Sequence, residues 1–427
     1  MSEVISLLKS YTNNAADGTG IVKLVDITKK ALHLKSNSQI PSTLVDYVKG
    51  QQQAQFGSYP DHKDVAPSSV FTAVFFLLML GHLYIFTRNS TRGHWFPLSL
   101  AFAFYCLLRL LGFALRIAWA KDILRLHVGI ASEVLLILPT VFLASFNLVL
   151  AQRIFTWKHP VGGNCKPFWY IMLAIYSIVA AVVIMTIVAG TVPYLYLLSQ
   201  SHYDMCRNVV KATSIMICIY SVLAILLVLS AFLIPSSSKD RSSLVFQPFW
   251  IKSFSPTYFV DKHAAQEGRR LFVLRHGPAA TSSKRTILRG RFFHSDTELG
   301  DLEEFETSDS NFSSRHNSSI SLIALTSICV LIGAMFRCVG LFLNQTYANQ
   351  SWIFKPVVMY MFWGYLETAV NVLYLYGRVD LRFYRPDRIP KSQITKVSSN
   401  IESSLTEDKR DLVSGPSSAH DGPATTF

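Results

Sequence analysis

Long apolar runs alternate with short polar links between residues 68 and 376. At 1.5 Å per residue, a helix of about 20 apolar residues crosses the ~30 Å hydrocarbon layer of a bilayer. Seven segments reach this length, at 68–87, 95–120, 127–150, 168–192, 209–233, 319–343 and 352–376. The pattern predicts an all-α membrane protein, a bundle of seven transmembrane helices with helices 1–5 in residues 68–233 and helices 6 and 7 in residues 319–376.

The stretches outside these runs are polar. Residues 1–67 lack the basic start and apolar core of a cleavable signal peptide, so we expect an extracytoplasmic, disordered N-terminal tail with a short helix near residues 21–34. The link at residues 234–318 is long and irregular, which predicts a largely disordered cytoplasmic loop between helices 5 and 6. The Ser/Thr-rich residues 377–427 predict a disordered cytoplasmic tail.

The net charge of +13 comes largely from the links that share a side with the C-terminus. Under the positive-inside rule, this asymmetry places the N-terminus outside and the C-terminus in the cytoplasm. The link between helices 6 and 7, on the side opposite to the C-terminus, contains no Lys or Arg. It contains two glycosylation triplets, which start at Asn344 and Asn349. We therefore expect a glycoprotein of the secretory pathway, in the plasma membrane first, with the vacuolar or endoplasmic reticulum membrane as alternatives.

Two arginines interrupt the apolar run at residues 95–120. Arg109 and Arg116 are seven residues apart, so they share one helix face. A guanidinium at the bilayer centre costs about 2.5–3.5 kcal/mol even on lenient scales, and arginine does not lose its charge. The sequence therefore predicts that this face meets polar partners inside the bundle.

Partners are suggested by depth along the predicted helices. Glu133 lies at the level of Arg116 on the next helix, Glu367 lies about 6 Å from the level of Arg109, and Arg337 lies near the level of Arg116. The predicted buried polar cluster consists of Arg109, Arg116, Glu133, Arg337, Glu367 and Asn371. Three interpretations stay open: structural ion pairs, a site for a lipid phosphate or another anion, and a proton relay.

Catalysis has little support in the sequence. No Walker loop, HExxH or GxSxG motif is present, and the six cysteines form no CxxC pair. His82 stands alone on its helix and is expected to be packed. We expect no enzyme activity, no metal and no cofactor. The basic half of the 234–318 loop is expected to contact the anionic membrane surface or the acidic half of the same loop, so no nucleic-acid partner is expected.

Two segments resemble a known family. The chain resembles a fungal family of seven-pass membrane proteins of unknown function. The resemblance lies in LLRLLGFALRIAWA of the helix that contains Arg109 and Arg116, in NLVLAQRIFTWKHP, and in the last two helices with Arg337 and Glu367. The layout is also similar to that of the fungal RTA-like lipid-translocating exporters. The resemblance covers roughly residues 68–385, and it implies a seven-pass fold with no settled activity.

We therefore predict a membrane protein that binds or moves a lipid or other anionic amphiphile through its polar cluster. The alternative is a seven-pass receptor, sensor or scaffold that signals through the 234–318 loop and the tail. Serines and threonines suited to protein kinases make that loop a candidate for phosphorylation and for cytoplasmic partners. Two features argue against a receptor. The third helix has no cysteine for an outer disulfide, and the triplet that follows it is Ala-Gln-Arg in place of a DRY-like motif. No helix shows a GxxxG face that would indicate an oligomeric state.

Overall fold

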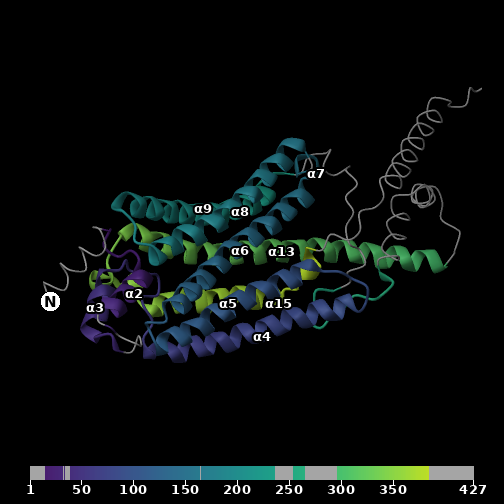
Figure 1. Cartoon of the computed structure of the whole chain (residues 1–427). Helices are drawn as coiled ribbons and strands as arrows, with labels where there is room; N and C mark the ends of the chain where they lie inside the picture. Colours follow the sequence, from purple (N-terminus) through teal and green to yellow (C-terminus); the bar gives the residue numbers. More distant parts are fainter. Residues whose placement is uncertain are drawn as a thin grey trace, which may run out of the picture.

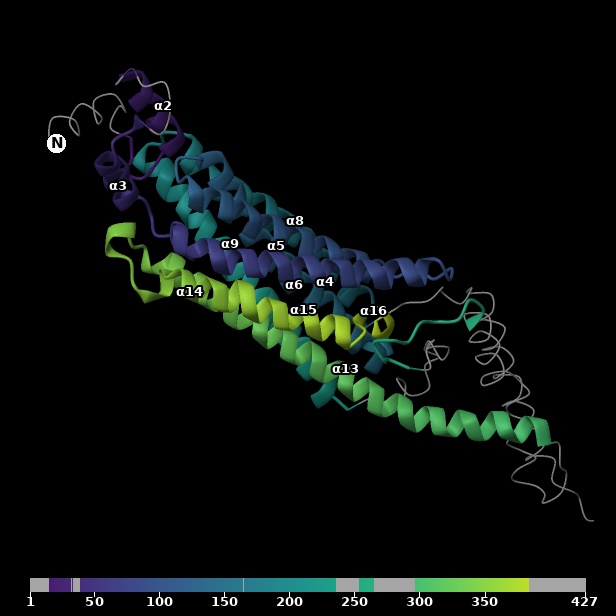
Figure 2. The same ribbon diagram turned by 90° about the horizontal axis from the view of Figure 1, so that it is seen from below.

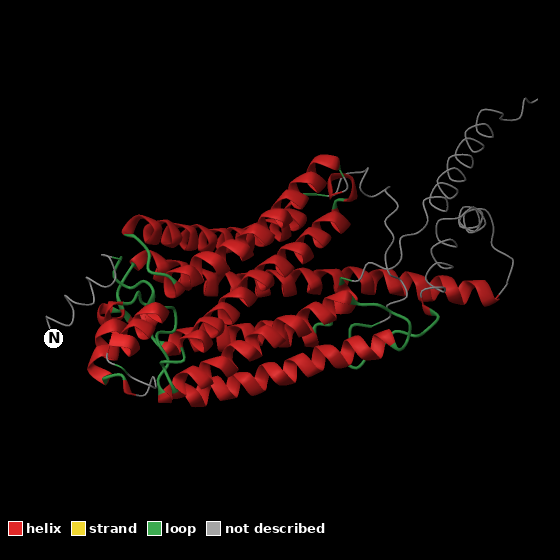
Figure 3. Cartoon of the chain, viewed as in Figure 1, coloured by secondary structure: helices red, strands yellow, loops and turns green. Residues whose placement is uncertain are grey.

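A computed structural model describes residues 15–31, 33, 39–163, 165–235, 253–264 and 296–383, with the backbone alone described for residues 296–317. Long helices run side by side along one axis (Figure 1), and every named element of the described residues is helical (Figure 3). Six helical segments are long and apolar enough to cross a membrane. They belong to α4 (Val65–Ser90), α5 (Pro97–Lys121), α6 (Leu126–Lys158), α8 (Lys166–Leu195), α9 (Gln200–Leu233) and α13 (Asp296–Leu343).

The predicted seventh helix is divided into consecutive pieces. A short 3₁₀ turn, η4 (Trp352–Phe354), is followed by α14 (Pro356–Met359), the π-helix η5 (Tyr360–Leu366) and α15 (Glu367–Tyr376). The six apolar helices therefore do not include this segment. Gly364 sits where η5 meets α4, because a Cβ at this position would lie 2.5 Å from the ring of Phe71.

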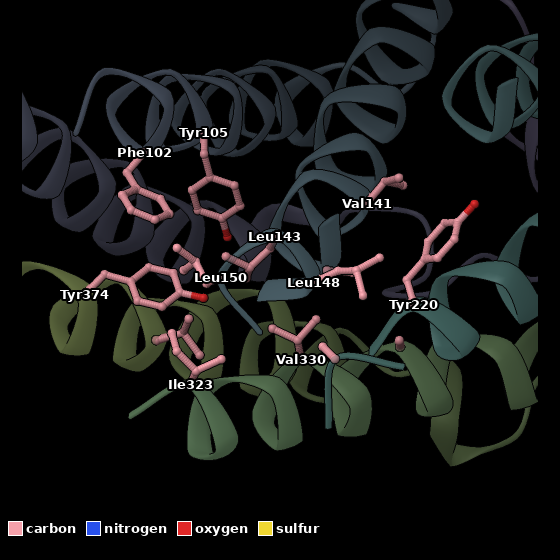
Figure 4. Close-up of a cluster of buried hydrophobic side chains, with 14 of the residues drawn as sticks. Phe102, Tyr105, Val141, Leu143, Leu148, Leu150, Tyr220, Ile323, Val330 and Tyr374 are labelled. Carbon is pink, nitrogen blue, oxygen red and sulfur yellow. The ribbon is translucent and has the colours of Figure 1, made fainter. Parts of the chain in front are cut away.

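The helices pack in a continuous sequence of neighbours. α5 lies between α4 and α6, α6 also contacts α8, α9 and α13, and α15 packs against α4 and α13. Buried side chains from α5, α6, α9, α13 and α15 meet in one core, where Tyr105 and Tyr374 lie among aliphatic residues (Figure 4). The core therefore joins the beginning and the end of the bundle.

The described part of residues 15–64 forms an N-terminal cap. It contains α2 (Ile21–Ala31), α3 (Ser42–Gln51) and the 3₁₀ turn η2 (His62–Asp64), and it covers the end of the bundle near the N label in Figure 1. Main-chain hydrogen bonds attach it to the α8–α9 link and to the segment after α13: Ala16 N donates to Leu198 O (2.8 Å), Gly20 N to Pro193 O (2.7 Å) and Ala54 N to Gln345 O (2.8 Å). The prediction of a disordered N-terminal tail is therefore wrong for these residues.

Aromatic packing explains why this polar segment folds. Phe56 lies 4.9 Å from Trp363 between ring centroids, and Tyr59 packs edge-on against Trp119 at 5.5 Å. Phe56 and Tyr59 are both buried. Burial raises the pKa of Tyr59 well above its usual value, which keeps the phenol neutral. Two aromatic residues thus anchor a stretch whose overall composition is typical of a tail.

Three further expectations change at the other end. The helix predicted at 127–150 is longer than expected, because α6 continues through Ala-Gln-Arg-Ile-Phe-Thr-Trp-Lys and ends before α7 (Pro160–Gly163). Within the loop predicted to be largely disordered, the structure describes residues 253–264 and the helical start of α13, which projects past the other helices (Figure 2). The predicted disordered tail begins too early, because residues 377–383 are ordered and α16 (Val379–Arg382) packs onto the bundle. The rest of the predicted loop and tails lies outside the described residues.

Candidate functional site

Arg109 and Glu367 form a buried ion pair that joins α5 to α15. The Glu367 carboxylate also accepts hydrogen bonds from the hydroxyls of Tyr105 on α5 and Thr140 on α6 (3.1 Å for Thr140). Arg109 in turn donates to the carbonyl of Leu136 at 2.5 Å and to Thr140 Oγ1 at 3.1 Å. Both carboxylate oxygens accept hydrogen bonds from groups of the chain, and we call this set of residues the helix clasp.

The π-helix η5 places two side chains of the last helical segment against Arg109. The Arg109 guanidinium lies 5.4 Å from the centroid of the Trp363 ring. Trp363 precedes Glu367, the ion-pair partner of Arg109, by about one helical turn. A π-helical turn is uncommon and is frequent at functional sites. Here it brings a cation–π contact and an ion pair onto the same guanidinium.

Asn371 belongs to the helix clasp. Its amide donates to the Glu367 carbonyl at 2.8 Å, one turn back along α15. Its Oδ1 lies 3.6 Å from the thiol of Cys106 on α5. One further turn along α15, Tyr374 donates to Asn147 Oδ1 at 2.5 Å, so the polar contacts continue toward α6.

Arg116 holds the N-terminal cap. Its Nη2 donates to the carbonyls of Gly57 (2.6 Å) and Ser58 (3.1 Å) and lies 3.5 Å from Asp64 Oδ2. The turn that presents these carbonyls has positive φ at both residues, +97° at Gly57 and +57° at Ser58. A Cβ at position 57 would lie 2.4 Å from the sulfur of Met359, so glycine is required there. Arg116 also contacts Glu133 Oε1 at 3.5 Å.

A cavity of about 130 Å³ lies between α6, α8, α9 and α13, beneath residues 52–56 of the N-terminal cap. Its apolar lining includes Ile130, Val134, Ile137, Leu138 and Ile187. Its charged lining consists of Glu133, Arg207, Lys211 and Arg337. Three bases and one carboxylate therefore face a space whose other walls are mostly hydrocarbon.

Arg337 differs from the other two buried arginines of the predicted cluster. Its residue surface is 4% exposed, yet no hydrogen bond or ion pair within 4 Å joins it to another residue of the described part of the chain. Glu133 faces the same cavity but is already in contact with Arg116. Arg207 pairs with Asp204 at 3.8 Å, and Lys211 lies 5.4 Å from the Phe342 ring centroid. The cavity is thus electropositive around Arg337.

The six predicted residues are therefore divided among three sites. Arg109, Glu367 and Asn371 form the helix clasp, Arg116 holds the cap, and Glu133 and Arg337 line the cavity. Depth along a helix predicted the two ion pairs but gave no information on which side of a helix each group faces. Sequence reasoning missed Asp64 and the cavity residues of the cap, because the segment was interpreted as a tail. It also missed Arg207, because this residue was counted only as a link charge.

The two glycosylation triplets lie at the capped end of the bundle. Asn344 directly follows α13 with a φ of +51°, and Asn349 ends the 3₁₀ turn η3 (Tyr347–Asn349). Both asparagines are exposed, so either could be reached by a modifying enzyme. Their modification stays a prediction.

The described residues contain few side chains that could bind a metal ion together. No group of three or more His, Cys, Asp or Glu side chains there has the arrangement of a metal site. His82 is buried and packs 5.5 Å from the Phe102 ring centroid, which agrees with a packed histidine. The expectation that the protein needs no cofactor stays untested.

Comparisons with known proteins give one match. A family model described as "Protein of unknown function (DUF3112)" matches residues 160–384, from α7 through α16. Glu367, Asn371 and Arg337 lie inside this match, whereas Arg109, Arg116 and Glu133 precede it. A search of curated proteins and a search of solved structures returned no match. The matched region is more than half of the chain, and the protein belongs to this family of unknown function.

Proposed function

We propose that this protein is an integral membrane protein that binds an anionic amphiphile in the cavity beneath the N-terminal cap. The observation that carries the proposal is Arg337, a buried guanidinium that faces the cavity without a hydrogen bond or ion pair to another described residue. Glu133 acts on Arg337 electrostatically but forms no close ion pair with it. A buried arginine without a hydrogen bond or close ion pair is costly, and a carboxylate or phosphate from a ligand would lower that cost.

The charge around the cavity supports a negative ligand. Its three bases face one carboxylate, Glu133, which already contacts Arg116. A second anion in the cavity would therefore meet a net positive surface. Charge-assisted hydrogen bonds to arginine are about twice as strong as neutral ones, and they would select the anion over a neutral group of the same size.

The apolar lining supports an amphiphile over a small ion. Aliphatic side chains of α6 and α8 form part of the cavity wall, and the cavity lies between helices that are apolar enough for a membrane. A ligand with a negative head and a hydrocarbon chain would satisfy both kinds of lining. The similarity in layout to lipid-translocating exporters favours the same ligand class, and movement of the ligand between leaflets would follow if the cap opens.

The proposed arrangement in the membrane has seven crossings, with residues 352–376 as the seventh. The capped end lies outside and the α7–α16 end lies in the cytoplasm. Flanking charges support this orientation, because Arg88, Arg92, Arg153 and Lys158 lie at the α7–α16 end. We place the protein in the plasma membrane of a fungus.

The experiment compares lipids that remain bound after purification. Protein extracted from its native membrane would be studied by native mass spectrometry as Arg337→Gln and as the matched control Arg125→Gln, whose side chain is 61% exposed at the same end. We expect an anionic lipid on the native protein and the control, and an occupancy about tenfold or more lower for Arg337→Gln, because hydrogen bonds to charged groups contribute about 1.5–3 kcal/mol. Equal anionic lipid on both variants would contradict the proposal.

A further inference from the structure

Residues 253–264, from the middle of the loop between α9 and α13, lie against the end of the bundle opposite the N-terminal cap. We call them the docked segment. Val260 of this segment is fully buried and clusters with Phe96, which precedes α5, and with Leu381 of α16. Figure 2 shows the segment as a teal trace beside α16. The segment is thus held in place by an apolar anchor.

Basic side chains bind the main chain of the docked segment. Arg378, fully buried and left-handed with φ +48°, holds Asp380 with two hydrogen bonds of 3.0 and 2.9 Å. Arg378 Nη1 and Arg92 Nη1 donate to main-chain carbonyls of the docked segment, and His94 Nε2 contacts a further carbonyl of the segment. The carbonyl partners are Pro256 (3.3 Å) and Tyr258 (2.5 Å) for Arg378, Phe259 (3.1 Å) and Val260 (3.3 Å) for Arg92, and Asp261 (2.7 Å) for His94.

Positive charge exceeds negative charge at this contact. The docked segment, residues 88–96 and residues 378–383 together contain five Lys or Arg side chains and two carboxylates. The bases are Arg88, Arg92, Lys262, Arg378 and Arg382, and the acids are Asp261 and Asp380. Arg88 and Arg92 lie 5.7 and 5.6 Å from the Phe259 ring centroid, and Arg382 lies 4.5 Å from that of Phe254. Ring faces and neutral carbonyls therefore occupy positions where an anion would bind more strongly.

Ser255 stands beside this positive charge in an accessible turn. Ser255, Pro256 and Thr257 are exposed, and Tyr258 N donates to Ser255 O at 3.0 Å to close the turn. The Ser255 hydroxyl lies 3.2 Å from that of Thr257, and the Ser255 carbonyl lies 3.5 Å from Arg378 Nη1. The sequence therefore offers a serine followed by proline, in an exposed turn, next to an arginine.

We propose that Ser255 is a phosphorylation site for a proline-directed protein kinase, and that the phosphate strengthens the attachment of the docked segment to Arg378 and its neighbouring bases. The kinase uses ATP: a bond forms between Ser255 Oγ and the γ-phosphorus, the bond to the β–γ bridging oxygen breaks, the hydroxyl proton passes to the kinase and ADP leaves. The added charge of about −1.5 to −2 at pH 7 would meet the net positive surface. In the cell, this inference rests on the proposed cytoplasmic orientation of this end.

The test uses the full chain in lipid nanodiscs, where both ends are accessible, so its outcome does not depend on orientation or on ligand binding. The protein is incubated with ATP and a proline-directed kinase, the modified residue is identified by mass spectrometry, and amide hydrogen exchange is measured for residues 253–264. Ser255→Ala is the unphosphorylatable variant, and Thr257→Ala is the control that keeps Ser255.

We expect phosphate on Ser255 in the native protein and in Thr257→Ala, with exchange in the docked segment slowed about threefold or more, as one new ion pair would give. Ser255→Ala should show no slowing. Either an unmodified Ser255 or exchange that is unchanged or faster after phosphorylation would overturn the inference.

Discussion

At the scale of single residues, the ion pair between Arg109 and Glu367 joins two helices through a carboxylate whose two oxygens both accept hydrogen bonds. Tyr105, Thr140 and Arg109 all donate to Glu367. Together with Thr140, the pair links the consecutive helices α5 and α6 to α15, which lies near the other end of the described chain. Its contribution is therefore best measured by removing one partner and then both.

We predict that Glu367→Gln destabilises the protein by about 3–5 kcal/mol, because it leaves the Arg109 charge buried without a counter-ion. The double variant Arg109→Met with Glu367→Met should be destabilised less than the single one, since apolar side chains can fill the space. Tyr105→Phe removes one donor and should cost about 1 kcal/mol. Unfolding in detergent measures all three, and a double variant less stable than Glu367→Gln would refute a structural clasp.

Both ion pairs could be predicted from the sequence, because a long arginine side chain can reach a carboxylate at a similar depth on a neighbouring helix. Arg109–Glu367 and Arg116–Glu133 are present. The environment of each arginine could not be predicted in this way. Arg116 is bound mainly by carbonyls of a turn, Gly57 and Ser58, and peptide carbonyls leave no trace in amino-acid composition.

At the scale of elements, the N-terminal cap and the last helical segment depart most from expectation. Hydrophobic periodicity predicts elements that bury a continuous apolar face. The cap instead depends on main-chain hydrogen bonds to residues 193, 198 and 345 and on a few aromatic anchors. The hydrophobic pattern could not predict the π-helix η5, because an apolar run has the same composition in an α-helix and in a π-helix.

We predict that Arg116→Gln loosens the N-terminal cap, because the variant loses the charged donor to Gly57 and Ser58 and leaves Asp64 without its ion-pair partner. Trypsin should cleave within residues 15–64 about tenfold faster or more, which corresponds to a loss of about 1.4 kcal/mol or more from local stability. The exposed Arg125→Gln is the matched control. Cleavage of Arg116→Gln at the control rate would show that Arg116 does not hold the cap.

At the scale of the whole molecule, the apolar helices imply a membrane, and the two ends carry different features. One end bears the N-terminal cap, the cavity and both glycosylation triplets. The other bears the docked segment and the basic residues around α16. The charge difference between the ends was readable from the sequence, whereas the cavity was not, because it is formed by four helices and a segment interpreted as a tail.

Native cysteines test the proposed orientation. Cys165 is exposed at the α7 end, and Cys206 is partly exposed near the start of α9, at the capped end. We predict that a membrane-impermeant maleimide added to intact cells labels Cys206 and not Cys165, and that Cys165 is labelled after permeabilisation. Cys165→Ser and Cys206→Ser identify each signal. Labelling of Cys165 from outside would reverse the orientation.

The central claim is that Arg337 makes the cavity a site for an anionic amphiphile. The most direct measurement compares the dissociation constants of dodecyl phosphate and dodecyl glucoside, which share a chain and differ in head charge, by calorimetry in zwitterionic nanodiscs with empty discs subtracted. We predict that the native protein binds the phosphate about tenfold or more tightly than the glucoside, and that Arg337→Gln loses this preference while Arg125→Gln keeps it. Equal affinity of the native protein for the two compounds, or a preference that survives Arg337→Gln, would contradict the account.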